Sequence, residues 1–405
     1  MTTKSKKMRL VSLALIIAIA ATLFIIPVTN NASAASSFTT VTYKMNQQYL
    51  RYVPSTYQKG TNVPLIVALH GCTQTAQQFA TSTKLNKMAE KYNFIVIYPM
   101  QATTRQIYMC WNFYWATSRT ATEPQMVANM VSQVKSQYSI DSSKVYVVGF
   151  SAGGALAASL ALLYPDVFAA ASITSGLMHN SSNMYTSTTA MLSGSANSPV
   201  NTGRSAYSSA GSRAHVIPII VFHGLTDSTV NVVNSYQIMC QFAAFNDLAD
   251  DGEYNRSIRG ESDVQETTSN YIHYKHYDSN GKIVMERYVV SELAGIYAHV
   301  WNGGDGVSYN NAASAIDETQ LIMDFFFKTI QKDAPAESTT TTTTTTTTKT
   351  STSKATTKTT TKAATTTKTT TTTTTTTTKP VTTTTKKTTT TTTKKTTKKR
   401  TWGWW

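Results

Sequence analysis

Short apolar runs alternate with segments of helix-forming residues between residues 63 and 330. The apolar runs are rich in β-branched and aromatic residues and have the length of buried strands; they cover residues 64–69, 145–148, 216–222, 271–277 and 284–290. The helical segments cover residues 76–91, 124–137, 152–163, 233–245 and 315–330. This alternation predicts an α/β fold, with a mostly parallel sheet covered by helices on both faces.

Three further segments complete the predicted architecture. Two strands near residues 39–45 and 48–53 should add an antiparallel edge to the sheet. The last helix, 315–330, has apolar residues at helical spacing and should pack on the sheet. Residues 179–213 are polar, rich in Ser, Asn and Thr and without a regular period, so we expect an insertion that could roof the functional site.

The sequence Gly149-Phe150-Ser151-Ala152-Gly153 lies between an expected strand and an expected helix. In that setting the pattern G-x-S-x-G is typical of a nucleophile elbow, a sharp turn that exposes a reactive serine. A side chain at Gly149 or Gly153 would collide with the neighbouring strand or helix. The helix N-terminus also directs free N–H groups at the reacting oxygen. A plain strand–helix turn is the alternative interpretation.

A catalytic serine of this kind is followed in the chain by an acid and then by a histidine, each on a loop after a strand. Asp227 fits the acid because it comes just after the strand 216–222. Other acids fit less well: Asp166 lies at a helix end, and Asp247, Asp250 and Asp251 lie in a polar acidic loop. As a purely structural residue, Asp227 would form an Asx turn with its own backbone.

The general base must come from the seven histidines of the chain. His299 lies after Asp227, follows the expected strand 284–290 and enters the glycine-rich loop 301–304. The others fit the chain order or the loop position less well: His70, His179, His215, His223, His273 and His276. We therefore expect Ser151, Asp227 and His299 to form a catalytic triad.

An oxyanion hole is expected where the strand 64–69 ends in His70-Gly71-Cys72-Thr73-Gln74. Folds with a nucleophile elbow take one backbone N–H from such an early loop and a second from the residue after the nucleophile. The amides of Cys72 and Ala152 would therefore stabilise the negative oxygen of the transition state.

Six motifs occur in a fixed order along the chain. They are Leu69-His70-Gly71-Cys72-Thr73-Gln74, Cys110-Trp111-Asn112, Gly149-Phe150-Ser151-Ala152-Gly153-Gly154, Tyr164-Pro165-Asp166-Val167-Phe168-Ala169-Ala170, His223-Gly224-Leu225-Thr226-Asp227 and Ala298-His299-Val300-Trp301-Asn302-Gly303-Gly304. Residues 40–330 thereby resemble the secreted polyhydroxybutyrate depolymerase-type esterases, a family that includes feruloyl and acetylxylan esterases of carbohydrate esterase family 1. The resemblance implies an α/β-hydrolase fold with the triad named above. One departure is Ala298, where the family usually has glycine.

The first 35 residues have the pattern of a secretory signal peptide: basic residues, an apolar run from Leu10 to Pro27, and Ala32-Ser33-Ala34. Cleavage is expected after Ala34 or Ala35, which would leave an extracellular protein without stable membrane insertion. An uncleaved membrane anchor is the alternative, since the apolar run is near the lower length limit for crossing a bilayer.

The two ends of the chain carry its formal net charge of +15. The expected signal peptide contributes four basic residues, and the segment from Ser338 onward contributes twelve lysines and one arginine, with no acid in either. The remainder, which contains the expected catalytic domain at residues 36–333, is nearly neutral at −2. Nothing in it indicates nucleic-acid binding.

Residues 334–400 consist almost wholly of threonine and lysine. Without apolar residues to offset the entropy of ordering, they should form a disordered linker or glycosylated stalk. The positive charge could bring this tail to a cell wall or an anionic surface. Residues 401–405 hold three tryptophans, which could stack on sugars, lie at a membrane interface or begin a truncated module.

Three cysteines in a secreted chain suggest one disulfide and one free thiol. Cys72 and Cys110 both lie beside expected active-site loops, so we expect them to pair. Cys240, in an apolar helical segment, is expected to be a buried free thiol. No cysteine–histidine spacing indicates zinc, and the acidic segment 247–253 lacks the ligand pattern of a calcium loop, so no metal or cofactor is expected.

The sequence therefore predicts a secreted serine esterase that acts through an acyl-enzyme. Feruloyl or acetyl esters of xylan are the favoured polymeric substrates, and polyhydroxybutyrate is the alternative. A non-catalytic cell-surface binding protein on a hydrolase scaffold is an alternative of another class. Trp111, Tyr297 and Trp301 are candidate aromatic walls of the substrate site, with a plain core role as the other interpretation.

Overall fold

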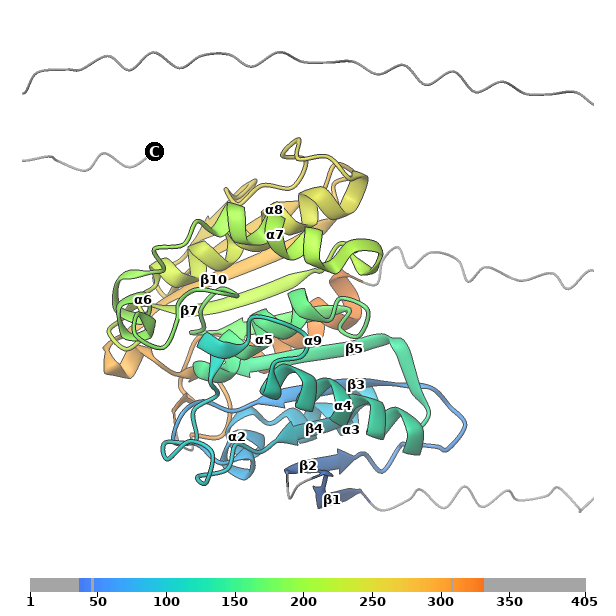
Figure 1. The fold of residues 1–405 in the computed structure, drawn as a ribbon. Helices are drawn as coiled ribbons and strands as arrows, with labels where there is room; N and C mark the ends of the chain where they lie inside the picture. The colour runs from blue at the N-terminus through green and yellow to red at the C-terminus, as the bar shows by residue number, and fades with distance from the viewer. Residues whose placement is uncertain (1–35, 45–46, 307–308, 331–405) are drawn as a thin grey trace, which may run out of the picture. The chain divides into compact units, whose positions relative to one another are not determined.

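The computed structural model describes residues 36–44, 47–306 and 309–330. These residues include a ten-stranded sheet (Figure 1). The strands lie in the order β1-β2-β4-β3-β5-β6-β7-β10-β9-β8. Their bounds are β1 (Ser37–Thr42), β2 (Gln48–Val53), β3 (Val63–Leu69), β4 (Ile95–Pro99), β5 (Ile140–Phe150), β6 (Ala170–Thr174), β7 (Ile219–Asp227), β8 (Val264–Thr267), β9 (Tyr271–Tyr277) and β10 (Ile283–Gly295). The expected signal peptide and the Thr/Lys tail lie outside the described residues.

The central strands of the sheet are parallel, from β4 through β3, β5, β6 and β7 to β10. Antiparallel strands flank them on both sides: β2 and β1 beyond β4, and β9 and β8 beyond β10. The predicted α/β class and the predicted antiparallel edge at the N-terminus are therefore confirmed. Because the central strands are parallel, their carboxyl ends meet at one edge of the sheet, where the following loops can build a site.

Helices cover both faces of the sheet. Side chains of β3 alternate between two hydrophobic clusters, with Leu65 and Val67 in one and Ile66 and Ala68 in the other. The first cluster includes residues of α4 (Thr122–Gln137), α5 (Ala152–Leu163) and α8 (Val233–Asp251). The second includes residues of α2 (Ala76–Thr83), α3 (Leu85–Tyr92) and α9 (Glu318–Asp324).

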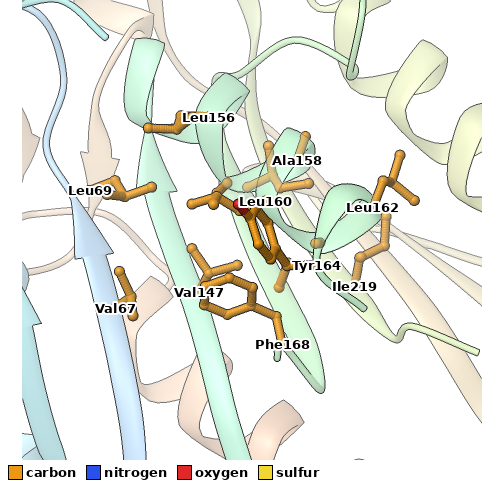
Figure 2. Close-up of a cluster of buried hydrophobic side chains, with 14 of the residues drawn as sticks. Val67, Leu69, Val147, Leu156, Ala158, Leu160, Leu162, Tyr164, Phe168 and Ile219 are labelled. Atoms are coloured by element: carbon orange, nitrogen blue, oxygen red, sulfur yellow. The ribbon is translucent and has the colours of Figure 1, made fainter. Parts of the chain in front are cut away.

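Helix α5, which follows the candidate serine, is embedded in the first cluster (Figure 2). All but one of its residues are buried. Leu156 and Leu160 of this helix lie in the same cluster as Leu69 of β3 and Val147 of β5. A helix that is apolar on every side is buried on every side. The core therefore fixes the position of the turn in front of α5.

Two helices occupy residues 76–91, for which a single helix was expected. Lys84 separates α2 from α3 with a left-handed backbone at φ 57°. The hydroxyl groups of Ser82 and Thr83 donate to the Phe79 carbonyl in the last turn of α2. Such side-chain bonds to the backbone compete with helix continuation, and apolar spacing does not show them.

The polar segment 179–213, expected to be an insertion because its sequence lacks a regular period, contains α6 (Ser187–Ser193) and α7 (Pro199–Ala210). Ser198 caps the start of α7, and Pro199 stands in its first turn. The buried residues of α7 are all small: Gly203, Ala206 and Ala210. A hydrophobic pattern does not reveal a helix whose contact face consists of glycine and alanine.

Helix α8 extends to Asp251 rather than ending near Phe245. Asp247, Asp250 and Asp251 therefore lie on a helix and not in an acidic loop. Asp247 is buried, and its carboxylate accepts the backbone amide of Ile258 at 3.1 Å. It thus ties α8 to the segment that follows.

The C-terminal helix expected at 315–330 begins at Glu318, after the capping residue Asp317. It changes to a π-helical turn at Phe325–Thr329. Phe326 stacks on Tyr146 of β5 with ring centroids 4.4 Å apart. The predicted packing of this helix on the sheet is therefore confirmed.

The apolar run 10–27 lies outside the described residues. Among the helices that the structure does describe, none has both the length and the apolar character needed to cross a membrane.

Candidate active site

Ser151 lies at the turn between β5 and α5 with an unusual backbone, φ 56° and ψ −121°. A non-glycine residue with positive φ is strained, and its surroundings must hold it in place. The Ser151 amide donates to the Thr174 carbonyl at the end of β6, at 2.8 Å, and the Ser151 carbonyl accepts the amide of Ala155. The predicted strand–turn–helix around Ser151 is therefore confirmed.

Close packing requires the glycines on both sides of this turn. A Cβ at Gly149 would overlap the Gly153 carbonyl, and a Cβ at Gly153 would overlap the Leu69 carbonyl of β3. The collisions predicted from the G-x-S-x-G pattern are therefore present. They place the start of α5 directly against the end of β3, where the loop with Cys72 begins.

One chain of hydrogen bonds joins the three residues that the sequence order singles out. His299 Nε2 lies 2.9 Å from Ser151 Oγ, and His299 Nδ1 lies 2.7 Å from Asp227 Oδ2. Asp227 is the last residue of β7, and His299 follows β10 through the short turn η4 (Ile296–Ala298). The parallel strands thus bring together residues that are 148 and 72 positions apart in the chain.

The carboxylate of Asp227 determines which nitrogen of His299 carries the proton. Because Asp227 Oδ2 can only accept, the proton lies on His299 Nδ1, and Nε2 is free to accept the hydroxyl proton of Ser151. Burial alone would raise the pKa of Asp227, but the hydrogen bonds that His299 and the Val230 amide donate to its carboxylate outweigh this effect and hold that pKa below its usual value. Asp227 is therefore ionised at neutral pH.

The other oxygen of Asp227 holds the turn after β7. Oδ1 accepts the backbone N–H groups of Thr229 at 2.8 Å and Val230 at 2.9 Å. His223 Nε2 donates to the Val230 carbonyl at 2.7 Å, and burial lowers the pKa of His223 to about 4. Asp227 thus makes the Asx turn with one oxygen and binds His299 with the other.

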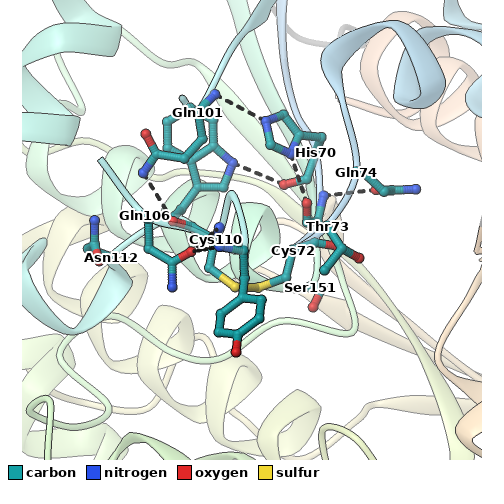
Figure 3. Close-up of a disulfide and its surroundings, with 12 residues drawn as sticks. His70, Cys72, Thr73, Gln74, Gln101, Gln106, Cys110, Asn112 and Ser151 are labelled. Carbon is teal, nitrogen blue, oxygen red and sulfur yellow. Dashed lines mark hydrogen bonds between the residues drawn. A yellow bond between two sulfur atoms is a disulfide. The ribbon is translucent and has the colours of Figure 1, made fainter. Parts of the chain in front are cut away.

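Cys72 and Cys110 form a disulfide, as predicted (Figure 3). It connects the loop after β3 to the segment that precedes Trp111. Among the described residues, neither the Cys72 amide nor the Ala152 amide donates a hydrogen bond to another protein group. Both N–H groups therefore lack a protein acceptor, as the donors of an oxyanion hole must before a substrate binds.

Comparison with protein families matches residues 47–266, more than half of the chain, to the family described as Esterase PHB depolymerase. The chain belongs to this family. The resemblance carried by the six motifs is therefore confirmed.

Three relatives show what the family contains. The poly(3-hydroxyalkanoate) depolymerase C of Paucimonas lemoignei is 32% identical over 254 residues, which cover 61% of this chain and 58% of that protein. The acetylxylan esterase A of Talaromyces purpureogenus is 33% identical over 205 residues, which cover 47% of this chain and 52% of that protein. The feruloyl esterase B of Thermothelomyces thermophilus is 39% identical over 135 residues, which cover 33% of this chain and 45% of that protein. The chain spans about half the length of these curated relatives.

A solved structure, the acetyl xylan esterase from Aspergillus awamori, superposes with a TM-score of 0.56 at 23% identity. The match covers 72% of this chain and 98% of that chain. It shows that the esterase family member described here has the α/β-hydrolase fold, as predicted.

Two of the three aromatic residues expected to line the substrate site lie in the core. Trp111 is fully buried and donates its indole N–H to the His70 carbonyl at 3.0 Å. Trp301 is also buried and donates to the Thr319 hydroxyl at 3.0 Å. The prediction is wrong for both, because an indole without exposed surface cannot contact a ligand. Tyr297, at 70% exposed, remains available for such a role.

Two buried glutamates support the loops of this site and were missed in the sequence. Glu123 accepts the backbone N–H of Asn112 at 2.7 Å and its side-chain N–H at 2.8 Å. Glu318 accepts the backbone N–H of Asn302 at 3.0 Å and is hydrogen-bonded to the Thr174 hydroxyl. Each lies in the first turn of a helix, where the helix dipole favours an acid. That position is the sequence signal that could have found them.

We expect Glu318→Gln to make the stability of the protein less dependent on pH. Burial raises the pKa of Glu318 to about 8, against the opposing hydrogen bonds of Thr174 and Asn302. A folded pKa above the unfolded value of 4.5 gives a stabilising contribution that is complete below pH 4.5 and is lost as the pH rises through about 8. Relative to the variant, the wild type should therefore lose on the order of a few kcal/mol between pH 5 and pH 9.

Urea unfolding of both proteins at the two pH values measures this difference. Equal pH slopes for the wild type and Glu318→Gln would show that the carboxyl group is ionised in the folded protein without a penalty.

Cys240 is a free thiol, as predicted, but it is only partly buried rather than buried. Burial still raises its pKa, which lowers its thiolate fraction and its reactivity. Within the described ranges, no group of three or more His, Cys, Asp or Glu side chains is arranged to hold a metal ion.

Proposed function

We propose that the chain is a secreted serine carboxylic ester hydrolase. The observation that carries this proposal is the hydrogen-bonded chain from Ser151 through His299 to Asp227, beside two unpaired backbone amides. Family membership supports it. A non-catalytic binding protein on the same scaffold is less well supported, because binding alone needs neither the tautomer of His299 nor its distance to the serine.

In the proposed acylation step, Ser151 Oγ attacks the ester carbonyl carbon and His299 Nε2 takes the hydroxyl proton. The carbonyl oxygen becomes negative and is stabilised by the amides of Cys72 and Ala152. Asp227 stabilises the imidazolium that forms. The tetrahedral intermediate then expels the alcohol, which receives its proton from His299, and leaves an acyl-serine.

Deacylation repeats the same steps with water as the nucleophile. His299 takes a proton from the water, and the resulting hydroxide attacks the acyl carbonyl at the same oxyanion site. Collapse of the intermediate releases the carboxylic acid and returns the proton to Ser151 Oγ. No cofactor is needed, because a proton acceptor, a nucleophile and hydrogen-bond donors supply every step.

As substrates we propose feruloyl or acetyl esters of plant cell-wall xylan. Two of the relatives named above are an acetylxylan esterase and a feruloyl esterase. Tyr297, exposed two residues before His299, supports this choice because a tyrosine ring can stack on a sugar or a ferulate.

Polyester is the second candidate. The relative that covers 61% of this chain is a poly(3-hydroxyalkanoate) depolymerase. Exposed apolar side chains also lie beside the triad, with Leu225 before Asp227 and Ile296 before His299. An apolar rim of this kind suits an insoluble polyester better than a hydrated polysaccharide.

A panel of methyl ferulate, acetylated xylan and polyhydroxybutyrate tests these proposals with the full chain. Release of ferulate or acetate, with no 3-hydroxybutyrate, would support the first candidate. The reverse pattern would establish the polyesterase. Ser151→Ala is the control in every assay, and activity that survives in it belongs to a contaminant. No hydrolysis of any ester by the wild type would favour the binding-protein alternative.

We further propose that residues 1–35 direct secretion. We also propose that the Thr/Lys tail keeps the enzyme at its site of action or captures an insoluble polymer. Removal of residues 334–405 should leave kcat and KM on a small soluble ester unchanged, because every proposed catalytic residue lies before Gly304. Binding to anionic or polymeric surfaces should weaken most at low salt, since thirteen positive charges are lost.

The two enzymes are compared in a soluble-ester assay and in a pull-down on the insoluble polymer. A tenfold lower kcat on the soluble ester after truncation would contradict this separation of roles.

A further inference from the structure

Tyr309 lies in the loop that follows His299, and 44% of its surface is exposed. We propose, on the basis of the serine esterase function proposed above, that Tyr309 is a specificity-determining residue of the ester site. Its phenol oxygen accepts a hydrogen bond from a hydroxyl group next to the ester of the substrate. The enzyme therefore prefers esters of polyhydroxylated alcohols to esters that lack such a hydroxyl.

The backbone holds Tyr309 beside the segment that carries the proposed base. Its carbonyl accepts the backbone amide of Trp301 at 2.9 Å. The strand that follows it, β12 (Asn310–Asn311), pairs in parallel with β11 (Trp301–Asn302). Tyr309 is therefore fixed relative to the segment that begins at His299.

The ring of Tyr309 packs against the residue that precedes the proposed nucleophile. Its centroid lies 6.2 Å from that of Phe150, which is joined directly to Ser151 in the chain. The Phe150 ring also lies 5.0 Å from the ring of His299. Tyr309 therefore lies at the rim of the proposed ester site, separated from His299 by one aromatic ring.

The hydroxyl group of Tyr309 is hydrogen-bonded to the loop after β3. Its oxygen lies 3.0 Å from Thr73 Oγ1, and Thr73 directly follows Cys72 in the loop drawn in Figure 3. Thr73 Oγ1 donates its single proton to the Cys72 carbonyl at 2.6 Å. Tyr309 must therefore donate its own proton to Thr73, so its oxygen can offer a substrate only the role of acceptor.

The backbone conformation of Tyr309 indicates that its side chain is required. Its φ of 54° lies in the left-handed region, which glycine adopts readily and a bulky residue adopts only under strain. Ser151 has a positive φ as well, at 56°. Strained residues of this kind gather at functional sites, where the surrounding contacts hold them in place. The contacts with Phe150 and Thr73 do so for Tyr309.

An acceptor beside the ester selects for a substrate that carries a donor. A sugar unit of an esterified polysaccharide has free hydroxyl groups near its ester, whereas a repeat unit inside a polyester chain has none. A site built to hydrogen-bond a hydroxyl disfavours the analogue that lacks it. Tyr309 therefore favours the xylan esters over the polyester.

A pair of acetate esters isolates this hydrogen bond. The monoacetate of trans-cyclohexane-1,2-diol has a hydroxyl next to its ester, and trans-2-fluorocyclohexyl acetate has a fluorine of similar size that cannot donate. The measured quantity is the kcat/KM of the first ester divided by that of the second. A neutral hydrogen bond changes such a ratio by about 3- to 10-fold. Tyr309→Phe removes only the phenol oxygen, so it should lower the ratio by about that factor.

Tyr254→Phe is the matched control. Tyr254 is exposed to a similar degree, at 41%, but its ring lies 5.0 Å from the guanidinium of Arg204 on α7. This variant should keep the wild-type ratio, and thermal melting establishes that both variants are folded. If Tyr309→Phe fails to fold, the wild type is tested alone. Its ratio should then exceed the ratio for hydrolysis by hydroxide ion by about 3- to 10-fold.

The ratio separates specificity from support of the loop. If Tyr309→Phe is folded and lowers kcat/KM equally for both esters, the tyrosine only supports the loop, and its proposed role is overturned while the esterase function stands. A wild-type ratio equal to that of hydroxide ion would overturn the same role. A wild type that hydrolyses neither ester would overturn the proposed function together with the role of Tyr309.

Discussion

Replacing Ser151 with alanine should lower kcat on any ester substrate by about 10⁴-fold or more. The hydroxyl is the proposed nucleophile, and within the described ranges His299 Nε2 is hydrogen-bonded to this hydroxyl alone, at 2.9 Å. Initial rates on a soluble ester, with the variant purified apart from the wild type, measure the loss.

The fold should survive this substitution. Ser151 Oγ makes its hydrogen bond to His299, while the backbone of Ser151 is held by Thr174 and Ala155. The melting temperature of Ser151→Ala should therefore stay close to that of the wild type. A folded variant that keeps more than a few per cent of wild-type kcat would exclude Ser151 as the nucleophile.

His299→Ala should be nearly as damaging as Ser151→Ala. Without the imidazole, Ser151 Oγ loses the only hydrogen-bond partner that it has among the residues placed by the structure, and with it the group that takes its proton. Members of a triad act as a unit, so the double variant should be little slower than either single variant. A double variant slower by the product of the two single effects would show that the residues act independently.

His273→Ala provides the comparison for this experiment. His273 is also buried and lies 2.8 Å from a carboxylate, that of Glu286, but it sits on β9 and stacks on Tyr288. Its loss should reduce stability and leave kcat of the folded enzyme within a few-fold of the wild type. Equal loss of kcat in folded His273→Ala would require another choice of base.

The sequence was sufficient to predict the proposed triad because the triad depends on the order of residues and strands along the chain. Ser151, Asp227 and His299 each follow an apolar strand, and parallel strands deliver their carboxyl ends to one edge. Those two facts bring the three residues together without any knowledge of side-chain packing. The pairing of Cys72 with Cys110 followed from the same placement of loops.

The parts that failed depend on contacts between distant segments. Trp111 and Trp301 are aromatic residues next to functional motifs, and composition cannot tell an aromatic wall from an aromatic support. The helix α7 packs through small residues, and the break at Lys84 comes from hydroxyl bonds to the Phe79 carbonyl. Glu123 and Glu318 are buried acids whose partners come from other loops, so their role appears only when the chain is folded.

Helix α9 and the π-helical turn after it run from the carboxyl ends of the central strands toward their amino ends. Glu318 contacts Thr174 at the carboxyl end of β6, whereas Ile330 lines a cavity with Asp141 and Pro218, near the amino ends of β5 and β7. Ile330, the last described residue, thus lies at the amino ends of these strands, whereas the triad lies at their carboxyl ends. A solid support or a fusion partner joined just after Ile330 would start at the amino ends of the strands and leave the carboxyl ends, where Ser151 lies, open to a large polymer.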